Sequence, residues 1–397
     1  MNTFSLFLIA STMTPGIEPT LAEKPEILQK LKALKPGEAV TLGKADVVGE
    51  FNETAKKWEL DRTGPKGRDF SIKMCWAEDR KRVLFCGANH AVPHRLNDVW
   101  EFDLPSLTWA MIYAPDNNRD YTGLGKDPSD VEFKNGTFIT KRGGPGIIAH
   151  TWWGLAYDSD AKQLLMMNTW VTEQKKMAVL LGAKPEDLAQ CPPLWSFDPA
   201  KRTWQYHRTE KPCPIAPFGG MLEYLPPLKR TMWHTNNWQM QASWLFDLSK
   251  NTWENAKSNG DTKVFEKEAP EPEQVGYYDA KRNMLIVHRH WATFHYSVKD
   301  NQWKKVRSEP KDSTDVPYGH DAYSPMYLDT ATGQGLLVEF KTNALWSYDP
   351  DTVTWKKLTP GGDPMPKGGK RLAYADPVHN VFVILDGTTI WAYRHGK

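Results

Sequence analysis

Short apolar segments alternate with charged or glycine-containing turns along most of the chain, and one aromatic phrase recurs among them. The phrase is an aromatic residue, a variable residue, a second aromatic and Asp, and a Trp stands six residues after the Asp. Short alternating segments separated by turns predict β-hairpins. Four copies are complete: 100–103 with Trp109, 195–198 with Trp204, 244–247 with Trp253, and 346–349 with Trp355. A degenerate copy is 294–297 with Trp303, and Asn52 with Trp58 keeps only the spacing.

A second hairpin is predicted upstream of each phrase, so each unit has four strands. It consists of an apolar segment that commonly ends in Tyr-Asp, a charged turn and a more apolar segment, as in 154–158 with 163–167 and 372–376 with 381–385. Two hairpins per unit, repeated about every fifty residues, predict an all-β propeller of four-stranded antiparallel blades. The repeated Trp and Asp are interpreted as structural, the Trp packing between blades and the Asp capping a turn.

With this period and these phrases, residues 45–397 resemble the kelch-repeat family, including the propellers of galactose-oxidase-like proteins. The double glycine of that repeat is largely missing, and Gly87 and Gly387 stand without a second one. The resemblance implies a fold and no particular activity, because propellers carry unrelated functions. Six blades are predicted, the ring being closed by an N-terminal strand around Trp58. Seven blades remain the alternative, because the gap between Trp109 and Trp204 is doubled and 47–60 could hold two strands.

The N-terminal residues predict export. Residues 1–22 contain an apolar stretch at 4–10 and end in Thr20-Leu21-Ala22, as signal peptides do, although no Lys or Arg precedes the stretch. Residues 23–44 are expected to form a helix at 25–34 and a linker. A secreted or periplasmic location would permit a disulfide between Cys191 and Cys213. Cys75 and Cys86 are expected to face each other across a hairpin, either paired or as buried thiols.

Composition narrows the range of partners. The chain has 50 Lys and Arg against 48 Asp and Glu, so nucleic acid is an unfavourable partner. No apolar segment beyond the N-terminus reaches the length of a membrane span. The oligomeric state is not readable. The 18 Trp exceed what the repeat uses, which leaves aromatic side chains for stacking against a ligand such as a pyranose ring.

Histidines gather on one predicted face of the ring. Loops between second and third strands and linkers between blades share a face, which we call the top face, and two insertions at 113–143 and 171–190 belong to it. The first should contain a hairpin turning at Asn135-Gly136, and the second a helix at 173–181. Six of the eleven His are expected on this face: His90, His150, His234, His288, His290 and His320.

Three functions fit this face. The chain is similar in fold and residue inventory to propeller polysaccharide lyases, including ulvan lyases, which implies β-elimination on an acidic polysaccharide. Arg371 or Arg289 would then neutralise a uronate, His150 or His320 would remove the proton, and Tyr318 or a second His would protonate the leaving oxygen. The side chains expected to contact substrate are His90, Asn168, Trp170, His234, Asn236, Trp238, Arg289, Trp291 and Lys341.

The second function is metal-dependent chemistry. His288 and His290, two positions apart on a strand, would hold a divalent metal with His234 or Glu339 as third ligand. A copper radical centre like that of galactose oxidase is disfavoured, because the sequence shows no matching Cys and Tyr pair. The third function is a non-enzymatic kelch module that binds a glycan or a protein. The sequence does not identify a cofactor.

Overall fold

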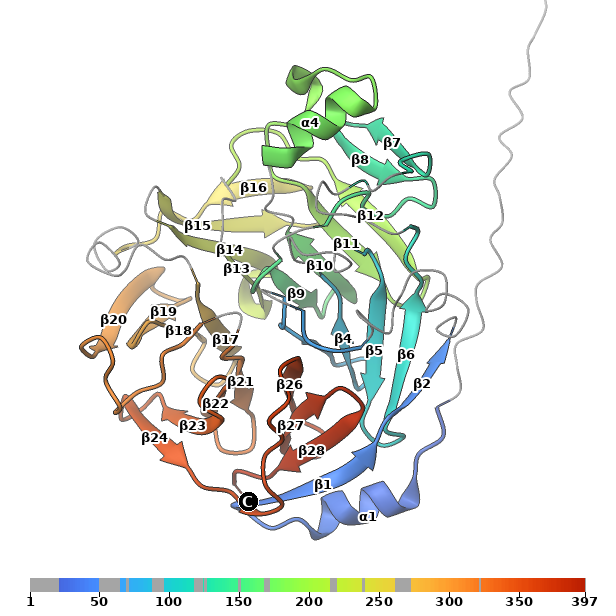
Figure 1. Cartoon of the computed structure of the whole chain (residues 1–397). Coiled ribbons are helices and arrows are strands. Elements are labelled where there is room, and N and C mark those ends of the chain that lie inside the picture. The colour runs from blue at the N-terminus through green and yellow to red at the C-terminus, as the bar shows by residue number, and fades with distance from the viewer. Residues whose placement is uncertain are drawn as a thin grey trace, which may run out of the picture.

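The computed structural model describes residues 21–49, 65–68, 71–87, 96–117, 124, 127–148, 151–167, 172–214, 220–237, 240–260, 273–320 and 323–396. Six antiparallel sheets of four strands follow one another around a ring in this part of the chain (Figure 1). The all-β propeller and the count of six blades are therefore confirmed.

The blades use consecutive hairpins, as the repeat predicts. In blades 1 to 6 the strands run from the channel outward in chain order, the last blade borrowing its outer strand from the N-terminal part of the chain. Blade 1 consists of β3 (Cys75–Ala77), β4 (Arg82–Phe85), β5 (Val99–Asp103) and β6 (Thr108–Tyr113). Blade 2 consists of β9 (Leu155–Asp158), β10 (Gln163–Met167), β11 (Leu194–Asp198) and β12 (Thr203–His207). Blade 3 consists of β13 (Met221–Leu225), β14 (Arg230–Asn237), β15 (Met240–Asp247) and β16 (Thr252–Asn255). Blade 4 consists of β17 (Val275–Asp279), β18 (Met284–Arg289), β19 (Ala292–Ser297) and β20 (Gln302–Ser308). Blade 5 consists of β21 (Met326–Asp329), β22 (Gln334–Glu339), β23 (Ala344–Asp349) and β24 (Thr354–Leu358). Blade 6 consists of β26 (Arg371–Asp376), β27 (Val381–Asp386), β28 (Thr389–Tyr393) and β1 (Glu38–Lys44).

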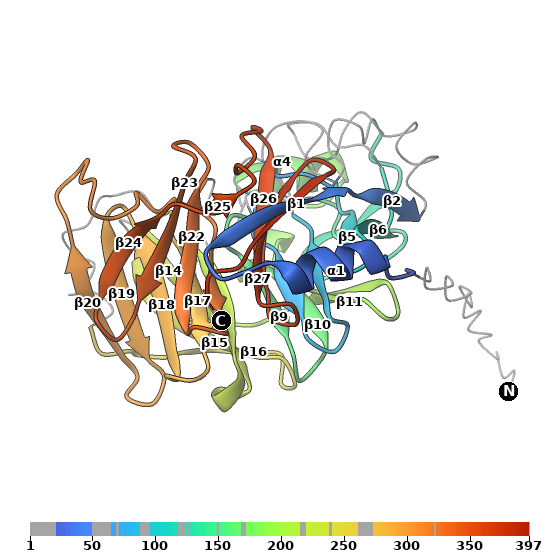
Figure 2. The ribbon, with the colours of Figure 1, turned by 90° about the horizontal axis from the view of Figure 1, so that it is seen from below.

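An N-terminal strand closes the ring, but it is not the segment around Trp58, which lies outside the described residues. Strand β1 pairs antiparallel with β28, while β2 (Asp46–Gly49) pairs parallel with β6 of blade 1 and β25 (Gly361–Gly362) adds to the outer edge of β1. Residues 38–44, which we expected to be linker, thus form the closing strand. Spacing alone pointed to Trp58, and β1 contains neither the Asp nor the Trp of the phrase. Helix α1 (Pro25–Ala33) runs alongside β1 (Figure 2) and buries Ile27 and Leu31.

The repeated residues have the structural roles predicted for them. The five closing Trp of blades 1 to 5 are 0 to 7% exposed. Some bond to the preceding blade: the indole N–H of Trp303 donates to Ser243 at 2.9 Å and that of Trp355 to Thr293 at 3.0 Å. The repeated Asp accepts backbone N–H groups of the turn that follows, as Asp349 does from Asp351 at 2.9 Å.

A layer of side chains fills the middle of the channel. Trp153, from the segment before β9, donates its indole N–H to the carbonyl of Gly276 in blade 4 at 3.0 Å. Its ring lies 5.6 Å from that of Tyr327 in blade 5, and the Tyr327 hydroxyl accepts the N–H of Met74 in blade 1 at 2.8 Å. Lys73 of blade 1 bonds to the carbonyl of Leu222 in blade 3 at 2.7 Å. The two mouths of the channel are thereby separated.

The two insertions pack on each other at the periphery of the ring (Figure 1). The first contains the predicted hairpin, β7 (Val131–Lys134) and β8 (Thr137–Thr140), whose turn residues Asn135 and Gly136 have φ of 55° and 79°. The second contains α4 (Thr172–Leu180) and a short 3₁₀ turn, Pro185–Asp187. Met177 of α4 is buried with Phe138 of β8 in one apolar cluster. In its described part, the long interval between Trp109 and Trp204 therefore holds these insertions in addition to blade 2.

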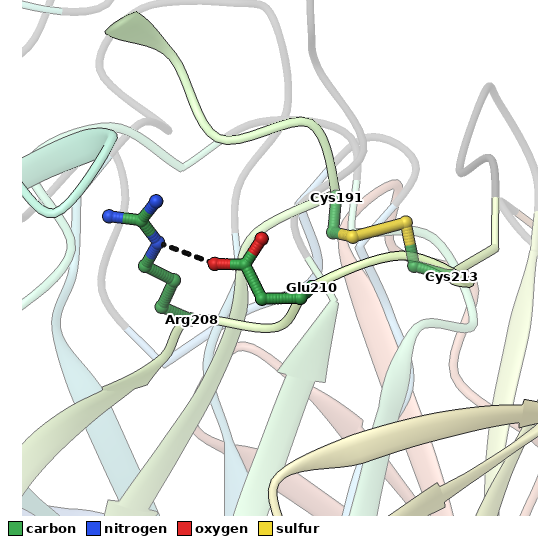
Figure 3. Close-up of a disulfide and its surroundings, with 4 residues drawn as sticks. All are labelled: Cys191, Arg208, Glu210 and Cys213. Carbon is green, nitrogen blue, oxygen red and sulfur yellow. Dashed lines mark hydrogen bonds and ion pairs between the residues drawn. A yellow bond between two sulfur atoms is a disulfide. The ribbon is translucent and has the colours of Figure 1, made fainter.

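One disulfide joins Cys191, before β11, to Cys213, after β12. Figure 3 shows it beside Arg208 and Glu210, whose side chains lie 3.2 Å apart. Cys75 and Cys86 are free and buried. Cys75 pairs with Leu84 in the hairpin register, so Cys86 lies two residues away from its partner position. No helix in the described part of the chain is long and apolar enough to cross a membrane.

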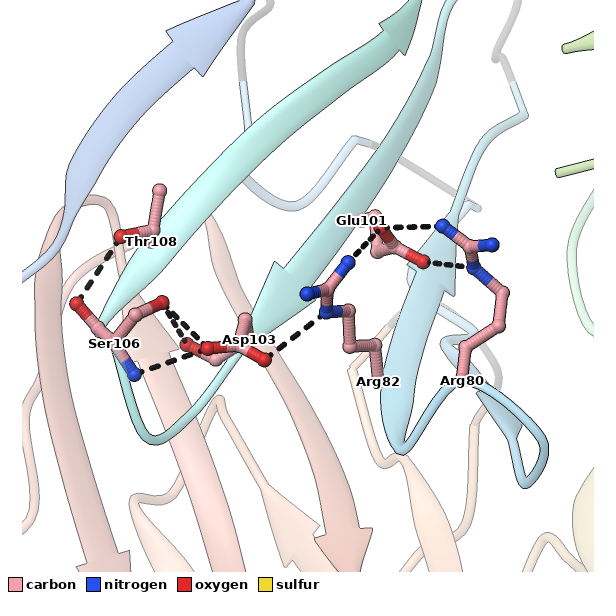
Figure 4. Close-up of polar contacts among 6 residues, drawn as sticks. All are labelled: Arg80, Arg82, Glu101, Asp103, Ser106 and Thr108. Atoms are coloured by element: carbon pink, nitrogen blue, oxygen red, sulfur yellow. Dashed lines mark hydrogen bonds and ion pairs between the residues drawn. The ribbon is translucent and has the colours of Figure 1, made fainter. Parts of the chain in front are cut away.

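Buried ion pairs connect the strands of blade 1 at the end of the blade that lies away from the top face. Glu101 is 1% exposed and accepts hydrogen bonds from Arg80 and Arg82, the second at 3.1 Å (Figure 4). Arg82 also donates to Asp103 at 3.0 Å, and Asp103 caps the next turn through Ser106. We call this side of the ring, which carries the turns between first and second strands, the bottom face.

Candidate functional site

The histidines expected on the top face divide into two kinds, and the first kind belongs to the core. His288 is fully buried in β18, with Nδ1 2.9 Å from the Thr293 hydroxyl and Nε2 2.9 Å from the carbonyl of Pro317. Since the Pro317 carbonyl can only accept, Nε2 carries the proton and Thr293 donates to Nδ1. Thr293 in turn accepts the indole N–H of Trp355, which completes a chain of three hydrogen bonds.

His234 has the same surroundings one blade earlier. It is fully buried in β14, its Nδ1 lies 3.1 Å from the Ser243 hydroxyl, and Ser243 accepts from Trp303 at 2.9 Å. Burial chiefly lowers the pKa of His234 to about 3 and that of His288 to about 4. Both side chains are neutral structural links between neighbouring blades, and neither reaches solvent.

His290 is of the second kind because the strand ends before it. Strand β18 stops at Arg289, and His290 and Trp291 form a two-residue turn to β19 with φ of 41° and 66°. Left-handed backbone is unfavourable for residues other than Gly and Asn, by about 1 kcal/mol or more each. The turn is held by hydrogen bonds from the His290 N–H to Gly319 and from the Trp291 N–H to Tyr318, at 3.2 and 3.0 Å.

The turn meets the linker from blade 4 to blade 5, and polar side chains gather where they meet. Tyr318 stacks on His290, with ring centroids 4.9 Å apart and its hydroxyl 3.4 Å from Nε2. Glu273, two residues before the start of β17, lies between two histidines: one oxygen is 3.6 Å from Nε2 of His290, and the other is 3.6 Å from Nε2 of His320. These four residues, Glu273, His290, Tyr318 and His320, are named the top-face cluster.

Three further side chains border the top-face cluster. The ring of Tyr323 lies 4.9 Å from His320, and the ammonium of Lys341 lies 4.0 Å from the centre of the Tyr323 ring. Trp291 is partly exposed, with its ring 4.6 Å from that of Tyr318. The cluster is thus flanked by an exposed cation and by aromatic surface.

Burial and charge set the protonation of the cluster. Burial chiefly lowers the pKa of His320 to about 4; Glu273 opposes this shift, while His290 and Lys341 add to it. Burial by itself would raise the pKa of Glu273, but contact with His290 and the charge of His320 lower it below its ordinary value. At neutral pH the cluster therefore holds an ionised carboxylate and an unprotonated His320.

The two arginines expected to neutralise substrate are both buried. Arg371 is 3% exposed and donates to the side chain of Asn343 and to the carbonyls of Pro366 and Phe340. Arg289 is 1% exposed within β18. Arg371 is the first residue of β26 and Arg289 the last residue of β18, and neighbouring protein covers both side chains. Lys341, by contrast, is exposed.

The expected metal ligands are not brought together. Both ring nitrogens of His288 are hydrogen-bonded, and His290 lies past the end of the strand, so the two do not form a chelating pair. Glu339 accepts from the N–H of Tyr318 at 2.8 Å and from the indole of Trp346 at 3.0 Å. Within the described ranges, no three His, Cys, Asp or Glu side chains group as metal ligands.

Other predicted residues have no described side chain. His90, His150, Asn168, Trp170 and Trp238 lie outside the described residues, and Asn236 lies near the end of β14. Glu273 and Tyr323 were missed by the sequence interpretation. Neither belongs to a repeat or motif, and the only available signal was their position in linkers of the top face.

The fold and the cluster define a class: a six-bladed β-propeller with a histidine and tyrosine cluster on its top face. No protein-family model matches the sequence, and no curated protein matches it. Among solved structures, 491 chains match the fold. One is from a crystal structure of a nidogen/laminin complex, 8% identical, with a TM-score of 0.42 over 74% of this chain and 81% of that chain. These likenesses carry no argument about fold or function.

Proposed function

We propose that the protein is an exported propeller of the kelch type that cleaves an acidic polysaccharide by β-elimination at the top-face cluster. The observation that carries the proposal is the continuous series of contacts Tyr318, His290, Glu273 and His320, at 3.4, 3.6 and 3.6 Å. Elimination needs a base, an acid and a cation, and the cluster with Lys341 offers all three side by side.

Each side chain has one role. Lys341 pairs with the uronate carboxylate, which acidifies the neighbouring C–H. His320, neutral at pH 7, takes that proton, and the C–H electron pair forms the new C=C bond. The bond from the adjacent carbon to the glycosidic oxygen breaks, and the leaving oxygen takes the hydroxyl proton of Tyr318. Trp291 supplies a surface on which a sugar ring stacks.

Glu273 and His290 reset the cluster after each turnover. The proton gained by His320 passes to Glu273, then to His290, and restores the hydroxyl of Tyr318. The reaction then consumes no net proton, and no external reductant or oxidant is involved. A small movement, or one bridging water, is enough to turn a contact of 3.6 Å into a hydrogen-bonded link.

The disulfide supports export. Disulfides persist in secreted and periplasmic proteins and are rare in reducing compartments. Cys191 and Cys213 lie where the chain emerges on the top face, before β11 and after β12. The kelch assignment rests on the recurring phrase, whose Trp and Asp have their structural roles in every complete copy.

The test is the ultraviolet absorbance of unsaturated uronate in digests of alginate, pectate, chondroitin sulfate, heparin and ulvan. Tyr318→Phe should lower kcat by about 100-fold or more, because it removes only the acid. The matched control is Tyr206→Phe, in blade 2, where no hydrogen bond of the hydroxyl is described; it should keep full activity. Absence of unsaturated product from every polymer would reject the elimination, and calorimetric binding of one of them would then identify a non-enzymatic glycan-binding module.

A further inference from the structure

A cavity of about 310 Å³ opens at the bottom face of the channel. It is lined by residues of all six innermost strands and of the turns that follow them, including Glu78, Ser159, Thr330 and Pro377. The volume is at the lower end of that of small-molecule sites, which suits a ligand of monosaccharide size.

The cavity is separate from the top-face cluster. Lys73, Gly276 and Tyr327, which line it, also belong to the layer that fills the channel. Trp153 lies in that layer, fully buried, with Lys73 5.4 Å from the centre of its ring. A ligand in the bottom cavity therefore cannot reach the cluster through the channel.

A buried ion pair forms the floor of the cavity. The side chain of Lys73 is 5% exposed, and its ammonium donates to Glu223 at 2.5 Å and to the carbonyl of Leu222 at 2.7 Å. An ammonium has three N–H donors, so one has no hydrogen-bond partner among the described residues. Glu223 is 20% exposed and uses one oxygen for Lys73, which leaves its other oxygen facing the cavity without a described partner. A donor and an acceptor thus stand side by side at the floor.

Aromatic rings form the walls. They are contributed by different blades: Trp76, Tyr157, Tyr224, Tyr278 and Tyr327. Trp76 is partly exposed and stacks on Tyr374 of blade 6, with centroids 6.4 Å apart and planes 13° apart. One face of its indole is therefore covered by protein.

We infer that the bottom cavity binds a neutral sugar, one hexose-sized unit. The charges of Lys73 and Glu223 cancel at the floor, where a hydroxyl both accepts from the ammonium and donates to the carboxylate. The other charged side chain of the lining, Glu78, is exposed in the turn at the rim. The aromatic walls suit the C–H faces of a pyranose ring. This site is independent of the proposed elimination, which takes place on the opposite face.

The experiment titrates the full protein with glucose, galactose, mannose and rhamnose, and with choline chloride as the cationic probe, by calorimetry and by saturation-transfer NMR. One of the neutral sugars should bind with a stoichiometry of one. Glu223→Gln should weaken that binding about 10-fold or more. Thr330→Trp, at the exposed rim, should abolish binding while the melting temperature stays near that of the parent.

Tyr318→Phe separates this inference from the proposed elimination, since it should leave sugar binding unchanged. Binding that survives both Glu223→Gln and Thr330→Trp would overturn the inference, as would binding of choline in place of every sugar or binding of none of the probes. Because Thr330 is exposed and makes no contact with the ion pair, its substitution keeps the test valid if Glu223→Gln is poorly folded.

Discussion

Replacing His288 by Gln should make the protein less stable at neutral pH and less sensitive to acid. Gln extends an amide N–H toward the carbonyl of Pro317, so the bond made by Nε2 of His288 can be retained. The contact with Thr293 and the packing against Trp355, whose ring centroid is 4.5 Å from that of His288, are weakened. Loss of one buried hydrogen bond and part of this packing should cost about 1 to 3 kcal/mol at neutral pH.

The effect of acid follows from protonation of the two states. His288 has a pKa of about 4 in the folded protein, and an unfolded His has a pKa of about 6.5. Above pH 6.5 both states are neutral, and the full stability is present. As the pH falls from about 6.5 to about 4, this His is protonated in the unfolded state but not in the folded state, so the free energy of unfolding decreases. At about pH 5 the loss from this one side chain is about 2 kcal/mol.

Urea denaturation at about pH 7.5 and about pH 5 measures the difference. The parent should lose about 2 kcal/mol more of its free energy of unfolding between these conditions than His288→Gln does. His234→Gln should behave in the same way, because burial lowers the pKa of His234 to about 3. If the parent and His288→Gln lose equal free energy on acidification, His288 is not a neutral core residue and the division of the histidines is incorrect.

Three further substitutions test the architecture. Glu101→Gln should destabilise the fold by about 3 kcal/mol or more in urea denaturation, because it leaves Arg80 and Arg82 beside an uncharged buried partner. The double variant C191S/C213S should lower the melting temperature by a few degrees in calorimetry, since the disulfide closes a loop with a separation of 22 residues and such loops are worth about 3 kcal/mol. Gly319→Ala should lower both stability and elimination activity, because Gly319 has φ of 71° and an added Cβ would lie 2.4 Å from the ring of His288; unchanged stability would mean that the linker moves freely.

The propeller was predictable because its strands, turns and interblade Trp are encoded locally. The phrase that ends at Trp355 carries the aromatic strand, the Asp that caps the turn and the Trp that bonds to the preceding blade within ten residues. Closure was only partly predictable, since β1 is an ordinary strand whose partner β28 is more than three hundred residues away in the chain. Long-range pairing of this kind leaves no periodic signal.

The composition of the site was harder to predict, because it depends on where one strand ends. The prediction that His288 and His290 act together assumed a strand that continues through both residues, because side chains two positions apart on a strand share a face. The strand ends at Arg289, and the turn of His290 and Trp291 contains neither of the residues, Gly and Asn, that indicate such a turn in a sequence. One residue therefore points into the core and the other toward the cluster.

This same geometry explains why a cluster forms between blades 4 and 5. His288 bonds to the carbonyl of Pro317, and the backbone N–H groups of His290 and Trp291 bond to the carbonyls of the next two residues of the linker. Hydrogen bonds from the end of β18 and from the turn that follows it thus fix the linker segment that bears Tyr318 and His320. His288 belongs to the core, yet it fixes the segment that carries the acid and the base. Protonation of His288 below about pH 5 should consequently loosen the cluster before the propeller unfolds, so elimination activity should fall at a higher pH than the loss of β-structure seen by circular dichroism.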